Sequence, residues 1–227
     1  MKIQLDRKEV LRYLGYRNQE LTPEMDALIN EMREEIQELA RFKYTYKIVD
    51  LVRDEEGKVA LKEGILPLLG ENIQRHLAQS EKAVVLAATL GFAVEQRLNY
   101  YSKTDLTRNF ILDSCGTQMI EEVCDGIEEE VKEKLGPGYH YTFRYSPGYG
   151  DYPIEVNNQL VLFLDGFKKI GLSVTDSHLL LPRKSVTAIM GIQTVPFVEE
   201  FDRCAACLAR SYCRFRKEGT RCYSKKD

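Results

Sequence analysis

The sequence contains no tryptophan and only three histidines, which are His76, His140 and His178. No two of them have the close spacing of paired zinc-binding histidines, so each is expected to have a structural role. The sequence also lacks a phosphate-binding P-loop, a G-x-S-x-G nucleophile motif and a G-x-G-x-x-G dinucleotide motif. We therefore do not expect a hydrolase or a nucleotide-hydrolysing enzyme.

Long apolar runs are absent as well. No run of about 18 apolar residues occurs, and the first residues lack the apolar segment of a secretory signal peptide. These absences predict a soluble cytoplasmic protein without membrane contact, in which the six cysteines stay reduced. The net charge of -3 argues against general nucleic-acid binding.

Helical and extended patterns mix along the 227 residues without a regular βαβ order. Apolar spacing and capping residues predict helices over residues 6–15, 22–40, 71–80, 105–135 and 157–170, the last capped by Asn157 or Asn158. Strands are predicted over residues 44–52, 59–64, 82–91, 139–145 and 184–195. The stretch 82–91 is almost entirely apolar, which favours a central strand buried on both faces. We predict an α+β fold, a single compact domain over residues 1–200 with a mostly antiparallel sheet, followed by a basic cysteine-rich tail over residues 201–227.

The stretch "RYSPGYGDYP", from Arg144 to Pro153, combines two glycines, two prolines and three tyrosines. An arginine offers a fork of donors that suits a carboxylate, and Gly148 permits a close backbone approach. Tyr149 and Tyr152 offer flat faces with polar tips. The stretch fits either a strand-ending arginine with a structured turn or a seat for a small zwitterion with an aromatic part.

Four segments, in this order along the chain, carry a resemblance to a known family: "EVLRYLGY", "IEEVCDGIEEEVKEKL", "RYSPGYGD" and "HLLLPRKSVTAIMGI". Together they resemble the S-adenosylmethionine-binding activation domain of vitamin B12-dependent methionine synthase, from about Lys8 to Ile192. The resemblance implies a component that supports reductive methylation of cob(II)alamin. The cobalamin is held by a partner, either a methionine synthase or a related corrinoid methyltransferase. The electron comes from a flavodoxin- or ferredoxin-type donor.

The resemblance also implies a ligand site without catalytic side chains, because the domain presents a reagent to a partner. Arg144 matches the arginine that binds the methionine carboxylate. The residues that match positions lining the ligand are Ser146, Gly148 and Tyr149. Glu121, or the adjacent Glu122, matches an acidic helix residue that contacts the ligand's polar groups.

This sequence departs from the family's pattern at several positions. Gly150 replaces the proline that usually follows the G-Y pair, and the family's N-terminal ligand aspartate falls at Gly15 or Tyr16. The family's later tyrosine pair has no match after Ile192. An alternative function is therefore a metal-binding interaction or electron-transfer protein that keeps the fold without S-adenosylmethionine chemistry.

The tail carries four cysteines in the pattern C-x2-C-x5-C-x8-C, namely Cys204, Cys207, Cys213 and Cys222. Four thiolates in so short a span suit a tetrahedral zinc ion or a [4Fe–4S] cluster. The alternative is a helical tail with free or redox-sensitive cysteines. Cys115 and Cys124 lie in the long predicted helix and are expected to be core residues.

Overall fold

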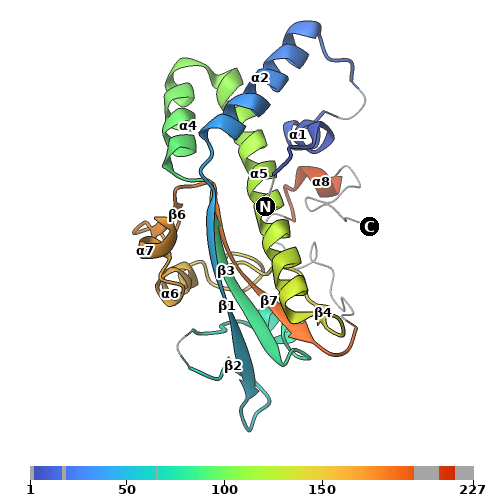
Figure 1. Cartoon of the computed structure of the whole chain (residues 1–227), viewed down its shortest axis with the longest axis vertical. Coiled ribbons are helices and arrows are strands. Elements are labelled where there is room, and N and C mark those ends of the chain that lie inside the picture. Colours follow the sequence, from blue (N-terminus) through green and yellow to red (C-terminus); the bar gives the residue numbers. More distant parts are fainter. Residues whose placement is uncertain (1–2, 17–18, 65, 197–209, 218–227) are drawn as a thin grey trace.

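The computed structural model describes residues 3–16, 19–64, 66–196 and 210–217. Its main sheet has five antiparallel strands in the order β2-β1-β3-β7-β4 (Figure 1). These strands are β1 (Lys43–Arg53), β2 (Val59–Leu61), β3 (Lys82–Thr89), β4 (His140–Tyr141) and β7 (Ser185–Gln193). A second small sheet pairs β5 (Ser173–Val174) with β6 (Leu180–Leu181). The predicted α+β fold with a mostly antiparallel sheet is confirmed.

Strand β3 lies at the centre of the main sheet, hydrogen-bonded to β1 on one side and to β7 on the other. Its side chains alternate between two hydrophobic cores, because successive residues of a strand point to opposite faces. Val84 and Leu86 enter one core, whereas Ala83 and Val85 enter the other. The predicted burial of this strand on both faces is confirmed.

One face of the sheet is covered by long helices (Figure 1). They are α1 (Arg7–Leu14), α2 (Pro23–Leu39), α4 (Phe92–Thr104) and α5 (Leu106–Leu135). Asp6 accepts the Lys8 N–H at the start of α1, and Gly15 ends that helix with a left-handed φ of 84°. The boundaries predicted for this first helix are confirmed.

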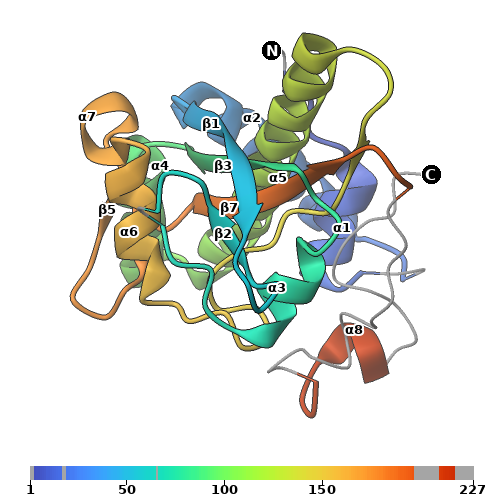
Figure 2. The ribbon, with the colours of Figure 1, turned by 90° about the horizontal axis from the view of Figure 1, so that it is seen from below.

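The opposite face is covered by shorter helices (Figure 2). They are α3 (Glu71–His76), α6 (Val156–Phe163) and α7 (Gly166–Ile170). Ile73, Leu160 and Ile170 from these helices share the second core with Ala83 and Val85. Among the described residues, none of the helices combines the length and apolar character that crossing a membrane requires.

Several predicted elements are shorter than expected. The helix predicted over residues 71–80 ends at His76, and the strand predicted over residues 59–64 ends at Leu61. The strand predicted over residues 139–145 pairs with β7 only at β4 and at an isolated bridge between Tyr145 and Ile189. Between them, Thr142 donates its backbone N–H to the Gly191 carbonyl at 3.0 Å, but its hydroxyl, rather than its own carbonyl, accepts the Gly191 N–H at 2.7 Å. The helix predicted over residues 157–170 divides into α6 and α7, because Asp165 has a left-handed φ of 54°.

Two polar residues near these elements have roles that the sequence patterns did not indicate. Asn157, a predicted cap, lies inside α6 and accepts a hydrogen bond from the Thr187 hydroxyl at 2.6 Å. Helix α4 was not predicted. Its Glu95 is buried and accepts the Arg183 backbone N–H at 2.9 Å and the Arg183 Nε–H at 2.8 Å. A charged residue on the buried side of a helix obscures its apolar spacing.

Candidate functional site

The Arg144–Pro153 stretch forms a compact turn that follows the bridge to β7. Tyr145 exchanges two backbone hydrogen bonds with Ile189, at 2.8 and 2.9 Å. The Tyr149 N–H then bonds to the Ser146 carbonyl at 3.1 Å, and the Gly148 N–H bonds to the Tyr152 carbonyl at 2.8 Å. These bonds fix the turn's backbone before any ligand arrives.

The turn is also fastened to helix α3. The Asp151 carboxylate accepts the N–H groups of Glu71 and Asn72, at 2.7 and 3.1 Å. Gly150 adopts a φ of 54°, and a Cβ atom there would stand 2.6 Å from Tyr145 Oη and overlap the Asn72 amide. The glycine that replaces the family's proline is therefore required by the close packing of this turn.

Substituting Gly150→Ala should lower the free energy of unfolding by about 3 kcal/mol. The alanine would have to adopt a left-handed backbone conformation, and its Cβ would also clash with the Tyr145 and Asn72 side chains. Gly57→Ala is the matched control. Gly57 has a φ of 79° with no atom within 4 Å of the place where a Cβ would stand, so only about 1 kcal/mol should be lost. Urea denaturation of both variants measures the difference, and equal losses would show that the turn is loosely packed.

Arg144 lies at the end of this segment that faces helix α5. Its Nη2 donates to Glu121 Oε2 at 2.8 Å, and its Nη1 donates to Asp125 Oδ1 at 2.9 Å and to Glu128. The side chain of Arg144 is only 17% exposed. The three carboxylates share one face of α5 because they are four and three residues apart.

The structure brings together two residues that the sequence proposed for the site, Arg144 and Glu121. Sequence reasoning missed Asp125 and Glu128. Their spacing from Glu121 within "IEEVCDGIEEE" is visible in the sequence and marks one helical face. However, acidic residues on a helix usually face solvent, so only the packing of Arg144 against α5 distinguishes these two.

Burial affects the ionisation of Glu128 in this cluster. It raises the pKa of the Glu128 carboxyl, and the charge of Asp125 adds to the rise, while the nearby Arg144 cation lowers it. Burial also raises the pKa of the Cys124 thiol to about 12, and that of Cys115 to about 12. Both cysteines are fully buried in the core, as predicted, and stay protonated at neutral pH.

Removing the cation should destabilise the protein in a pH-dependent way. Arg144→Ala leaves three carboxylates uncompensated, which should cost about 3 kcal/mol at pH 7. Burial and the charge of Asp125 raise the pKa of Glu128, so without Arg144 this carboxyl binds a proton more readily in the folded state than in the unfolded state, and the loss should shrink as the pH falls toward about 4. Thermal unfolding of the wild type and of Arg144→Ala between these pH values measures this loss of stability.

Arg108→Ala provides the control, because Arg108 pairs with the largely exposed Glu31 at 2.6 Å and should contribute about 1 kcal/mol or less. An Arg144→Ala loss that is small, or that does not depend on pH, would contradict the cluster.

The other residues proposed for the site lie on the turn itself. Gly148 has a φ of 90°, and a Cβ there would stand 4.0 Å from Ile154 Cδ1, which is ordinary van der Waals contact. Tyr149 is 56% exposed and meets the buried Tyr145 edge-on, with ring centroids 6.0 Å apart. Tyr152 is only 1% exposed, so its ring belongs to the core and offers no face to a ligand.

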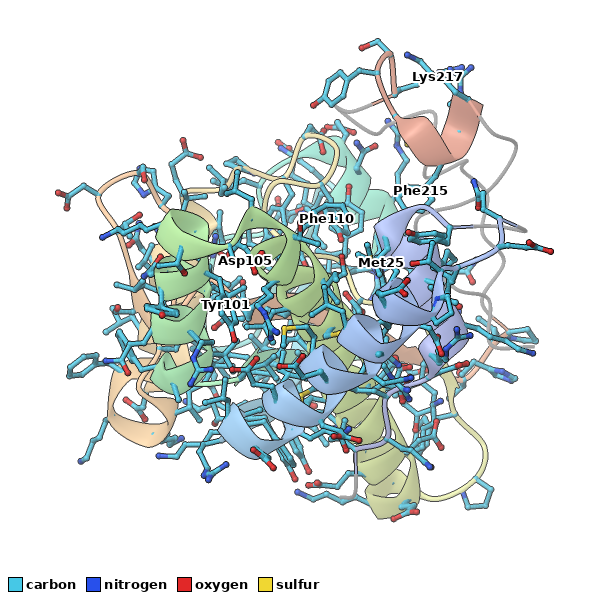
Figure 3. The ribbon with its side chains drawn as sticks, turned by 90° about the horizontal axis from the view of Figure 1, so that it is seen from above. Met25, Tyr101, Asp105, Phe110, Phe215 and Lys217 are labelled. Atoms are coloured by element: carbon cyan, nitrogen blue, oxygen red, sulfur yellow. The ribbon has the colours of Figure 1, made fainter. Side chains whose placement is uncertain are left out.

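A separate apolar cavity lies at the opposite end of α5 from the Arg144 cluster. It measures about 360 Å³ and is lined by Gly15, Tyr16, Met25 and Phe110, among others (Figure 3). Phe110 and Glu121 are 11 residues apart on the same helix, a rise of roughly 16 Å. Gly15 and Tyr16 line this cavity, and they are the positions at which the family's N-terminal aspartate falls.

Two of the histidines have the structural partners expected of them. His76 is buried, with its Nε2 2.8 Å from Thr142 Oγ1 and 2.9 Å from the Phe143 carbonyl oxygen. His178 Nδ1 lies 2.7 Å from the Asn158 amide nitrogen. His140 is exposed on β4. Within the described residues, no group of three or more histidine, cysteine or acidic side chains could hold a metal ion.

The described part of the tail is a short segment against helix α1. It contains Cys213 and helix α8 (Arg214–Lys217), while Cys204, Cys207 and Cys222 lie outside the described residues. The guanidinium of Arg12 on α1 stands 5.6 Å from the centre of the Phe215 ring (Figure 3). This cation–π contact places Phe215, two residues after Cys213, beside the helix that packs on α5.

The described architecture is an antiparallel sheet between two layers of helices. A similar solved structure is the MetH reactivation domain bound to AdoHcy, with a TM-score of 0.62 and 11% sequence identity. The match covers 95% of this chain and 82% of that chain. No family model and no curated protein matches the sequence. At this identity the likeness establishes the fold.

Proposed function

We propose that this protein binds S-adenosylmethionine at the Arg144 turn and supports reductive methylation of cob(II)alamin held by a partner corrinoid protein. The observation that carries the proposal is the "RYSPGYG" turn on a fold shared with a domain bound to AdoHcy. AdoHcy is what remains of S-adenosylmethionine after its methyl group has been transferred.

In this proposal the protein's residues bind and orient the reagent. The Arg144 guanidinium pairs with the ligand's carboxylate, and Glu121 beside it pairs with the ammonium group. Tyr149 supplies an exposed aromatic face, and Gly148, which has no side chain, lets the ligand approach the backbone. The rigid turn holds the sulfonium methyl toward the partner, so the rate gain comes from positioning.

The corrinoid and the electron belong to other proteins. A flavodoxin- or ferredoxin-type donor reduces cob(II)alamin, and the reduced cobalt takes the methyl group from sulfur. The chain alone should therefore methylate nothing. Its fold provides a surface for reagent presentation, while the chemistry is that of the partner's cofactor.

A reconstituted mixture tests this function. The protein, a methionine synthase that lacks its own reactivation domain, an electron donor and S-adenosylmethionine should convert a cob(II)alamin spectrum into a methylcobalamin spectrum. Arg144→Lys keeps the charge but loses the paired donors, so it should weaken S-adenosylmethionine binding about tenfold or more and slow the conversion at limiting ligand. Calorimetry and visible absorbance measure the two effects.

The control variant Arg108→Lys changes a surface pair distant from the turn and should behave like the wild type. If the complete mixture with several corrinoid partners yields no methylcobalamin, although S-adenosylmethionine binds, the reactivation function is wrong.

A second function is favoured by the cysteine spacing of the tail. We propose that Cys204, Cys207, Cys213 and Cys222 hold a zinc ion or a [4Fe–4S] cluster, in a tail that forms a unit of its own beyond residue 200. The basic residues around them offset the negative charge of four thiolates. Such a site would serve an interaction or electron-transfer role, either beside S-adenosylmethionine chemistry or without it.

Protein purified without oxygen should contain about one zinc ion or one cluster per chain. Cys213→Ser should lower the metal content severalfold, whereas Cys115→Ser, which changes a core cysteine, should leave the metal content of the folded protein unchanged. Elemental analysis and thiol titration measure this. Finding neither iron nor zinc, with all four tail thiols freely reactive, would reject the site.

A further inference from the structure

The side chains that contact Arg144 carry more negative than positive charge. Three carboxylates, from Glu121, Asp125 and Glu128, surround one guanidinium, so the ionised cluster has a charge of +1 - 3 = -2. The neighbouring cation Lys132 is paired with another carboxylate, that of Glu129, at 2.7 Å. Lys132 therefore does not form an ion pair with the three carboxylates around Arg144 that would offset their excess negative charge.

The negative charge extends toward helix α1. The pKa of the Tyr13 hydroxyl is raised, first by burial and then by the charge of Glu121, while the neighbouring Arg12 cation lowers it. On the same helix, the cation Arg12 is engaged by Glu9 through two hydrogen bonds of 2.8 and 2.9 Å. A ligand group that lies between the turn and α1 thus meets a negative potential.

One carboxylate is enough to pair with an arginine, so the other two require a different explanation. A ligand that brings only its own carboxylate to Arg144 is repelled by the excess charge. A ligand that also brings positive charge is attracted, because opposite charges interact strongly where water is partly excluded. The cluster is therefore matched to a ligand with a net positive charge.

We propose that Asp125 and Glu128, together with Glu121, make the Arg144 site selective for a sulfonium ligand over the corresponding thioether. The proposal rests on the proposed function, because it assumes that the amino-acid end of S-adenosylmethionine binds at Arg144. S-adenosylmethionine then carries a net charge of +1 and AdoHcy none, although both have the same carboxylate, ammonium and adenosyl groups.

Covalent geometry keeps the sulfur close to the cluster. Four bonds separate the carboxyl carbon from the sulfur, so the sulfur lies within roughly 6 Å of the ligand's carboxyl carbon and within roughly 10 Å of the guanidinium that binds it. At about 10 Å, one unit charge partly shielded by solvent changes a binding constant by about twofold to fifteenfold. The two more buried carboxylates, Asp125 and Glu128, should act more strongly than Glu121, which is 44% exposed.

This selectivity has a consequence for turnover. In the transfer, the methyl carbon–sulfur bond breaks and its electron pair remains on sulfur, while the cobalt supplies the pair for the new cobalt–carbon bond. The donor protein has supplied the electron that reduced the cobalt beforehand. The sulfur thereby becomes neutral, the ligand loses the charge that the cluster selects, and the spent ligand leaves more readily than the reagent.

Affinities of the full-length protein for S-adenosylmethionine and AdoHcy, measured by calorimetry, test the proposal. The wild type should prefer S-adenosylmethionine by about tenfold or more. Asp125→Asn and Glu128→Gln should each lower this preference by about threefold to tenfold, and Glu121→Gln by about threefold. Each amide keeps an oxygen acceptor for Arg144, and thermal unfolding of each variant verifies that it is folded.

Glu129→Gln is the matched control, because it removes a charge from the same helix at a side chain that is 67% exposed and pairs with Lys132. Its preference should stay within about twofold of the wild type. Equal binding of both ligands by the wild type, or an unchanged preference in all three cluster variants, would overturn the charge selectivity alone. Absence of binding by either ligand would instead refute the proposed function.

Discussion

The ion-pair cluster of Arg144 joins the two parts of the molecule on which the candidate site depends. Arg144 comes from the segment that leaves the sheet, and its three partners come from one face of the longest helix. A guanidinium in a largely buried position must keep its partners, since an unpaired buried charge is far more costly than a pair. The position of the turn is therefore set by α5 on one side and by the Asp151 contact with α3 on the other.

The position of the turn also depends on the rigidity of the sheet. Strand β3 is hydrogen-bonded on both edges and buried on both faces, so the two helical layers have a rigid common support. Tyr145 transfers this rigidity to the turn through its paired bonds with Ile189 on β7. The proposed presentation of a reagent to a second protein requires such support, because a small displacement at the reacting atom is costly.

The sequence allowed the fold class, the central strand and the long helix to be predicted, because each depends on regular apolar spacing over many residues. It failed where a polar side chain replaces a regular backbone contact. Thr142 accepts a bond that a ladder would provide, and buried Glu95 interrupts the apolar side of α4. For the site, Arg144 and Glu121 followed from a resemblance, whereas Asp125 and Glu128 depend on how the arginine packs, which no short motif encodes.

The two outer strands of the main sheet are very short, with three residues in β2 and two in β4. A long open edge would offer a row of unpaired backbone groups to a strand from another molecule, which is a common route to aggregation. Here, however, β2 pairs only with Leu51–Arg53 of β1, and β4 pairs only with Ile192 and Gln193 of β7. The outer strands therefore cover only the ends of the two long strands beside them, so the addition of a further strand is resisted mainly by what packs beside those edges, such as helix α7 next to β1.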